Sequence, residues 1–189
     1  MALVVTTSQT VGPFFHLGLS LLDLSDIAGP EIPGRRIAIE GRVLDGERVP
    51  VSDAILEFWQ ANCHGKYADG AGRQDTRLNQ NFKGYGRVAT NPDGLFRLKT
   101  IKPGRVPGPH GSLQAPHIEV SVFMRGLLKQ LITRIYFPDD PANTEDPILK
   151  LVAPERRSTL IGRWENAAQN VLRWDVLLQR DDETVFFDV

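Results

Sequence analysis

The chain has 189 residues, a formal net charge of −1, 41% hydrophobic residues and 24% charged residues. This composition is typical of one ordinary globular domain and excludes a disordered chain. The lack of a basic excess argues against a nucleic-acid partner. No apolar run reaches the roughly 18 residues that a membrane helix requires. We therefore expect no nucleic acid and no membrane among its partners.

Cys63 is the only cysteine, so the chain cannot form an internal disulfide. A protein without disulfides fits a reducing compartment. Residues 1–10 show neither a basic leader nor the apolar centre of a signal peptide. These features predict a cytoplasmic protein.

Residues 1–34 are predicted to form an N-terminal arm, because Gly and Pro interrupt them throughout, and only residues 14–19 could dock on another surface. Residues 35–189 are predicted to form a single domain, in which alternating apolar residues and turn signals indicate short strands. The turn signals include Asp45-Gly46 and the run Asn91-Pro-Asp-Gly94. Strands are expected at 37–43, 54–60, 86–90, 95–100, 117–123, 130–137 and 172–179.

Seven or so strands with little helix predict an all-β fold, an antiparallel β-sandwich. One short helix is expected at 154–161, where Pro154 suits a first helical turn. Residues 61–85 and 102–116 form long loops rich in Gly and Pro. Loops of that length in a compact domain are often functional.

His117 and Glu119 share one face of a predicted strand, because strand side chains alternate with a period of two. They could supply two ligands of a metal site. No further ligands follow at a recognisable spacing, so a hydrogen-bonded histidine in a core or interface is the stronger interpretation. Arg134 lies within another predicted strand and shares a face with Tyr136. On pattern alone, it is a salt-bridged residue or one whose charge reaches solvent.

Several segments occur in an order and spacing that resemble the intradiol ring-cleaving dioxygenases along nearly the whole chain. They include Gly84-Tyr-Gly-Arg87, Ala115-Pro-His117 and Leu131-Ile-Thr-Arg-Ile-Tyr-Phe137. Further segments that carry this resemblance lie at 8–14, 57–67, 91–94, 100–104 and 183–188. The Gly-Pro arm and the Phe-Phe-Asp ending favour the α over the β type of subunit found in heteromeric members.

The resemblance implies a transthyretin-like (prealbumin-like) sandwich paired with a related β subunit. The β subunit of such enzymes holds Fe(III) through two tyrosinates and two histidines. By resemblance, these four ligand positions fall at Gln74, Val106, His117 and Glu119. A family arginine near the histidines falls at Gln114. Only His117 keeps a family ligand, so the resemblance implies that this chain alone binds no iron and is inactive, and that the cofactor Fe(III) belongs to the β subunit.

The resemblance also implies the reaction of the assembly, which cleaves protocatechuate with O2 between its two hydroxyl groups to 3-carboxy-cis,cis-muconate. Protocatechuate and O2 would meet at the α/β interface. There the arm residues Thr10, Gly12 and Pro13, together with Arg134, would line the pocket of the β subunit and bind substrate.

Two other classes of protein remain open at this point. One is a self-sufficient intradiol dioxygenase with an altered set of ligands, which would hold a full equivalent of iron by itself. The other is a non-catalytic β-sandwich binding module, which would need no β chain.

Overall fold

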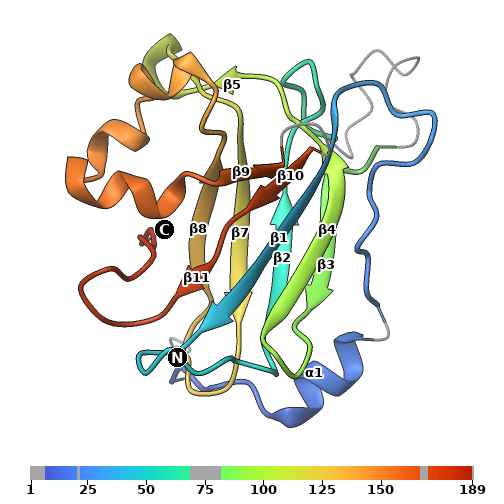
Figure 1. Cartoon of the computed structure of the whole chain (residues 1–189), viewed down its shortest axis with the longest axis vertical. Coiled ribbons are helices and arrows are strands. Elements are labelled where there is room, and N and C mark those ends of the chain that lie inside the picture. The colour runs from blue at the N-terminus through green and yellow to red at the C-terminus, as the bar shows by residue number, and fades with distance from the viewer. Residues whose placement is uncertain (1–6, 21, 69–81, 167–169, 189) are drawn as a thin grey trace, which may run out of the picture.

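The computed structural model describes residues 7–20, 22–68, 82–166 and 170–188. Two sheets pack face to face, so the predicted all-β sandwich is confirmed (Figure 1). Within the described residues, the five-stranded sheet contains β1 (Arg36–Leu44), β4 (Leu95–Ile101), β9 (Arg163–Asn166), β10 (Val171–Arg173) and β11 (Val176–Leu177). The four-stranded sheet has the order β3 (Tyr85–Ala89), β2 (Ile55–Trp59), β7 (His117–Phe123) and β8 (Leu131–Tyr136). A separate pair joins β5 (Val106–Pro107) and β6 (Leu113–Gln114).

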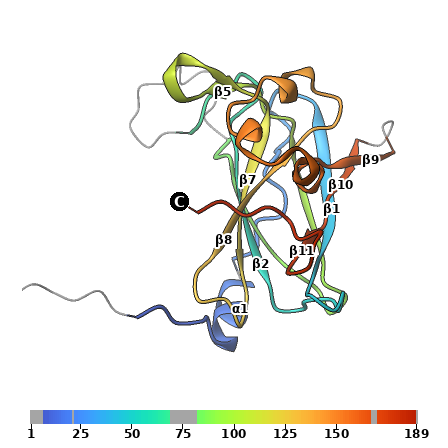
Figure 2. The same cartoon turned by 90° about the vertical axis from the view of Figure 1, so that its left-hand side faces the viewer.

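Helical segments lie outside the sheets. The helix α1 (Pro13–Ser20) lies at one end of the sandwich, and the β5–β6 pair lies at the other (Figures 1 and 2). The sequence pattern did not predict α1, because Gly18 interrupts its short apolar run. Four 3-10 helices follow: η1 (Pro109–Gly111), η2 (Pro141–Thr144), η3 (Leu149–Leu151) and η4 (Pro154–Leu160). The predicted helix at 154–161 is therefore present as η4.

The core between the sheets is built by the alternating side chains of the strands. On β7, the side chains of Ile118, Val120 and Val122 are fully buried in this core. The period of two therefore turns His117, Glu119 and Ser121 to the outer face of the four-stranded sheet. A smaller apolar cluster covers part of that outer face and contains Ala115, Tyr136, Ala142, Leu149, Val152 and Leu160.

The five-stranded sheet is mixed, although a purely antiparallel sandwich was predicted. β1 runs parallel to both β10 and β11, and antiparallel to β4. The single strand predicted at 172–179 is also divided into two. Between the two parts, Trp174 N donates to Glu40 O at 2.9 Å, and the Asp175 carboxylate accepts from Arg42 N at 2.8 Å. A side chain thus replaces a backbone acceptor at this point and interrupts the ladder.

The predicted arm has two parts in the structure. Leu24 bridges to Arg87 on β3, and Asp26 bridges to Lys99 on β4, so this short stretch joins one sheet to the other. The Arg36 guanidinium donates to the carbonyls of Gly29 at 2.9 Å and Pro30 at 2.8 Å, which fixes the following residues. Residues 24–34 therefore belong to the sandwich of their own chain, and residues 7–20 lie beyond them. Docking of the arm on a partner stays a prediction.

Across the described residues, no helix is both long and apolar enough to cross a lipid bilayer.

Gly41 permits the close approach of β1 to the chain between β10 and β11. A Cβ atom at this position would lie 1.7 Å from the Trp174 carbonyl oxygen and 2.8 Å from the Phe96 ring. We expect Gly41→Ala to lower the free energy of unfolding by about 3 kcal/mol, because backbone must move to admit the methyl group. Urea unfolding checks this. Gly29→Ala is the matched control, because its Cβ would meet nothing within 4 Å; equal unfolding midpoints would contradict the prediction.

Candidate functional site

The candidate site lies on the outer face of the four-stranded sheet, at the end of the sandwich that carries β5 and β6. Strand register places His117 opposite Tyr136, Glu119 opposite Arg134, and Trp59 opposite Glu119. Two adjacent strands therefore present two rows of polar side chains to the same face. We use the name outer-face site for Tyr67, Gln114, His117, Glu119, Arg134 and Tyr136.

His117 is nearly inaccessible to solvent, with 5% of its surface exposed. Its Nδ1 atom lies 2.8 Å from the Ala115 carbonyl oxygen. Since a carbonyl only accepts, Nδ1 carries the hydrogen and Nε2 keeps a lone pair. Burial, and secondarily the charge of Arg134, lowers the pKa of His117 to about 4. The imidazole is therefore neutral at pH 7.

Arg134 is half-buried and held by residues of its own chain. Its Nη1 atom donates to Gln114 Oε1 at 2.7 Å, and its guanidinium carbon lies 5.7 Å from the centre of the Phe187 ring. Gln114 Nε2 in turn donates to the Pro107 carbonyl at 2.9 Å. No carboxylate among the described residues lies within ion-pair distance of Arg134, although Glu119 is its cross-strand neighbour. The site therefore contains a fixed positive charge.

Asp146 supports the outer-face site through hydrogen bonds and was not predicted from the sequence. Its carboxylate is fully buried and accepts from Ala115 N at 2.6 Å, Leu149 N at 2.7 Å and the Tyr136 hydroxyl at 3.2 Å. Burial, followed by the nearby charge of Asp146, raises the pKa of the Tyr136 phenol, so Tyr136 stays protonated. Asp146 thus fixes both the start of β7 and the end of β8. Its position before Pro147 signals a turn, but nothing local signals its burial.

Tyr67 is a second residue that the sequence reasoning missed. Its ring stacks on Trp59 with centres 6.1 Å apart and planes 9° apart. Burial raises the pKa of the Tyr67 phenol, the charge of Arg134 lowers it, and the charge of Glu119 raises it. Because Trp59 is the cross-strand neighbour of Glu119, the stacking on Trp59 places the Tyr67 ring beside the outer-face site. The available signal was its place in the 57–67 segment that carries the resemblance.

The four predicted ligand positions lie in different surroundings, and one of them is outside the described residues. Gln74 lies outside the described residues. Val106 is buried in β5 and has no donor atom in its side chain. His117 and Glu119 share the outer face of β7, as the period of two predicts. Within the described ranges, no group of three or more His, Cys, Asp or Glu side chains could hold a metal ion.

The predicted arm residues lie at the opposite end of β7. Thr10 Oγ1 accepts a hydrogen bond from Gly126 N at 2.8 Å. The Phe15 ring lies 5.4 Å from the ring of Phe123, the last residue of β7. Pro13 is the first residue of α1, and a Cβ atom on Gly12 would meet nothing within 4 Å. The structure does not bring these arm residues together with Arg134 in one chain.

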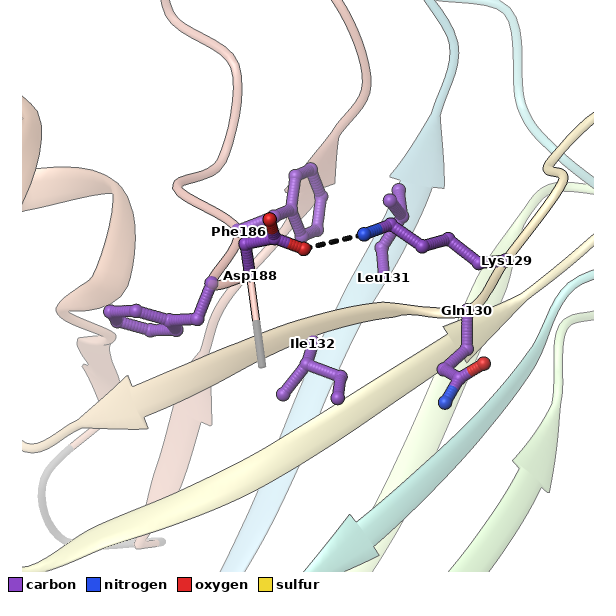
Figure 3. A pocket seen from close by; sticks show the side chains of 7 residues that line it. Lys129, Gln130, Leu131, Ile132, Phe186 and Asp188 are labelled. Carbon is purple, nitrogen blue, oxygen red and sulfur yellow. Dashed lines mark hydrogen bonds and ion pairs between the residues drawn. The ribbon is translucent and has the colours of Figure 1, made fainter.

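A hollow of about 270 Å³ lies between these two regions, where β8 begins. Its lining consists of Lys129, Gln130, Leu131, Ile132, Phe186, Phe187 and Asp188 (Figure 3). The Lys129 ammonium and the Asp188 carboxylate lie 2.5 Å apart at this hollow. Phe187 N donates to Ile132 O at 2.7 Å, so the C-terminal segment covers the free edge of β8.

This arrangement of strands and site can be compared with that of known proteins. Residues 20–180 match the family model described as dioxygenase. The protocatechuate 3,4-dioxygenase alpha chain of Burkholderia cepacia is 42% identical to this chain, over 97% of each protein. This chain belongs to the intradiol dioxygenase family.

Other intradiol dioxygenases support the assignment and distinguish two types of subunit. The protocatechuate 3,4-dioxygenase beta chain of Burkholderia cepacia is 35% identical, over 94% of this chain and 77% of that protein. Among solved structures, the dioxygenase domain of a dioxygenase carbohydrate-binding protein fusion from Streptomyces sp. SirexAA-E matches with a TM-score of 0.64. That pair shares 29% identity over 82% of this chain and 86% of the other. Identity and coverage are thus both higher for the alpha chain than for the beta chain.

The low pKa of His117 predicts a pH dependence of stability. Unfolding restores the ordinary value near 6.5, so between pH 6.5 and about 4 the unfolded chain binds more protons than the folded one. The free energy of unfolding should therefore fall as the pH falls through this window, by up to about 3 kcal/mol from His117. Urea unfolding at several pH values should show a shallower fall for His117→Gln. The exposed His110→Asn is the control, and equal slopes in all three proteins would refute the assignment.

Proposed function

We propose that this chain acts as the alpha subunit of a heteromeric protocatechuate 3,4-dioxygenase. The assembly cleaves protocatechuate with O2 between its two hydroxyl groups and yields 3-carboxy-cis,cis-muconate. The observation that carries this proposal is the 42% identity to an alpha chain of that name, over 97% of both proteins. A beta chain of an enzyme of the same name is also related to this chain, at 35% identity, which supports a protein of that type as the partner. The chain would be inactive without that partner.

We further propose that the beta subunit, and not this chain, binds the Fe(III) ion. The residues at the family's ligand positions, together with Arg134, fit a tyrosinate-rich ferric site poorly. Val106 supplies no ligand atom, and the Arg134 cation acts electrostatically on both Tyr67 and His117. A second positive charge this close disfavours a bound metal cation. When bound in the partner, Fe(III) would activate the catechol ring toward O2; this chain would position and shape the pocket around it.

The arm is proposed to reach the pocket of the beta subunit, with protocatechuate and O2 bound at the interface. The Thr10 hydroxyl accepts a hydrogen bond from Gly126 N, and Gly12, two residues later, is exposed. On the adjacent helix α1, Phe14 is 82% exposed and Leu17 is 62% exposed. Exposed apolar side chains of this size are typical of protein interfaces. Gly12 would permit close approach of backbone to the partner's pocket, and Pro13 would stiffen the arm.

Arg134 is proposed to supply positive potential at the same interface. A guanidinium has five N–H donors, so the bond to Gln114 leaves donors for an outside anion. The ring carboxylate of protocatechuate is such an anion, and charge-assisted hydrogen bonds favour arginine for this role.

Gly12 allows the arm proposal to be tested without disturbing the fold. Gly12→Val should leave the unfolding midpoint of the chain unchanged, because the position is open in this chain. In the reconstituted heteromer it should lower kcat/KM at least about tenfold, because the side chain would enter the partner's pocket. Gly29→Val is the matched control at an equally open position. Unchanged kcat/KM in the assembled Gly12→Val enzyme would remove the arm from the pocket.

The proposed role of Arg134 predicts a specific kinetic change. In the heteromer, Arg134→Ala should raise KM for protocatechuate about tenfold, which corresponds to about 1.4 kcal/mol of lost substrate binding. Steady-state kinetics measures this change, and metal analysis of the separated beta chain should show full iron content. If KM does not change, Arg134 does not contact the substrate.

A further inference from the structure

The Arg134 guanidinium is held by two groups that come from different parts of the chain. Gln114 on β6 accepts from Nη1 with its Oε1 atom at 2.7 Å. The Phe187 ring, from the C-terminal segment, has its centre 5.7 Å from the guanidinium carbon. An arginine side chain on an open surface samples many rotamers, and ordering it lowers its conformational entropy. These two contacts therefore restrict where the charge of Arg134 can lie.

The Gln114 amide is fixed in turn and carries no charge. Its Nε2 atom donates to the Pro107 carbonyl at 2.9 Å, so its oxygen is the atom that faces Arg134. The pairing of Val106 with Gln114 in the β5–β6 ladder keeps the backbone of this residue in place. A carboxylate at this position would pair with the guanidinium and cancel its charge. The neutral amide orients the cation and leaves its charge available to an outside anion.

The C-terminal segment, residues 183–188, fixes the place of the Phe187 ring. Thr133 Oγ1 donates to the Val185 carbonyl at 2.8 Å, and Phe187 N donates to the Ile132 carbonyl at 2.7 Å. These two bonds fasten the segment along the edge of β8. Val185 and Phe187 also pack against the smaller apolar cluster of the outer face. The ring therefore contacts the guanidinium from a position that backbone bonds and packing both determine.

Alternation along the C-terminal segment separates its two phenylalanines. Phe186 packs against the core between the sheets, whereas Phe187 packs against the cluster on the outer face. Phe187 is the one whose ring contacts Arg134. Phe186 is therefore a neighbour of the same size and chemistry that serves the core, and it provides a control position.

We propose that Gln114 and Phe187 are positioning residues, which hold Arg134 ready for the ring carboxylate of the substrate. The inference rests on the proposed role of Arg134 in the heteromer and extends it to two residues that act through the guanidinium. Because the guanidinium is oriented when the chain folds, less side-chain entropy is lost when substrate binds. The bond to Gln114 leaves other guanidinium donors for the carboxylate. The C-terminal segment thereby contributes to substrate binding.

Steady-state kinetics of the reconstituted heteromer tests the inference. Gln114→Ala and Phe187→Leu should each raise KM for protocatechuate about threefold, with a smaller change in kcat, because the guanidinium must then be ordered on binding. In an Arg134→Ala background, the same substitutions should raise KM no further, since their effect passes through that side chain. Phe187→Tyr keeps a ring and should retain the parent KM. Phe186→Leu is the matched control and should also retain it.

A second measurement on the full-length chain follows the orientation of the guanidinium directly. In nitrogen-15 NMR, the Nε–H signal of Arg134 is assigned by its loss in Arg134→Lys. Its order parameter should be that of a rigid group in the parent chain and in Phe186→Leu. It should fall in Gln114→Ala and in Phe187→Leu, and to below about 0.6, the range of a mobile group, in the double variant. Circular dichroism confirms that each variant is folded.

The two measurements separate failure of this inference from failure of the proposed function. If Arg134→Ala raises KM but folded Gln114→Ala and Phe187→Leu do not, the positioning role is overturned and the proposed role of Arg134 stands. An unchanged order parameter in the folded double variant overturns the positioning role as well, and so does an equal rise in KM with and without Arg134. If Arg134→Ala leaves KM unchanged, the proposed contact with substrate fails, and the positioning role fails with it.

Discussion

The period of two along β7 is the constraint on which both the core and the site depend. Ile118, Val120 and Val122 are fully buried between the sheets, and this register cannot slip by one residue without exposing all of them. The same register fixes His117 and Glu119 on the other face, opposite Tyr136 and Arg134. Core packing therefore determines which polar groups meet at the site. The side chains at the outer face can therefore change only by substitution, because the buried residues fix which face of β7 points outward.

The local patterns predicted the strands well because each strand carries its own signal. Alternation located β7 and β8, and the side chain of Asn91 accepts from Asp93 N and Leu95 N in the turn that the sequence indicates. The parallel pairing of β1 with β10 and β11 was not predictable, because it joins residues more than a hundred positions apart. The break at Asp175 has the same origin. Its carboxylate replaces a backbone acceptor for Arg42, a contact that no local pattern encodes.

The site was partly predictable for a similar reason. His117, Glu119 and Arg134 stand out in the sequence because charged or titratable groups interrupt apolar strands. Tyr67 and Asp146 do not stand out, since both lie in irregular segments and reach the site only through the fold. Burial then determines the protonation states of the groups at the site. The neutral state of His117 depends on its enclosure, and the protonated state of Tyr136 depends on enclosure together with Asp146.

The short bridge formed by Leu24 and Asp26 has a consequence for how the N-terminal region is divided. It pairs with β3 in one sheet and with β4 in the other, so it connects the two sheets. Residues 7–20 lie upstream of this bridge and contact the sandwich through Thr10, which accepts from Gly126 N, and through Phe15, which packs against Phe123. Loss of residues 24–34 would remove the pairing that connects the two sheets. One continuous stretch of chain thus contains a part proposed to meet a partner and a part that ties the two sheets together.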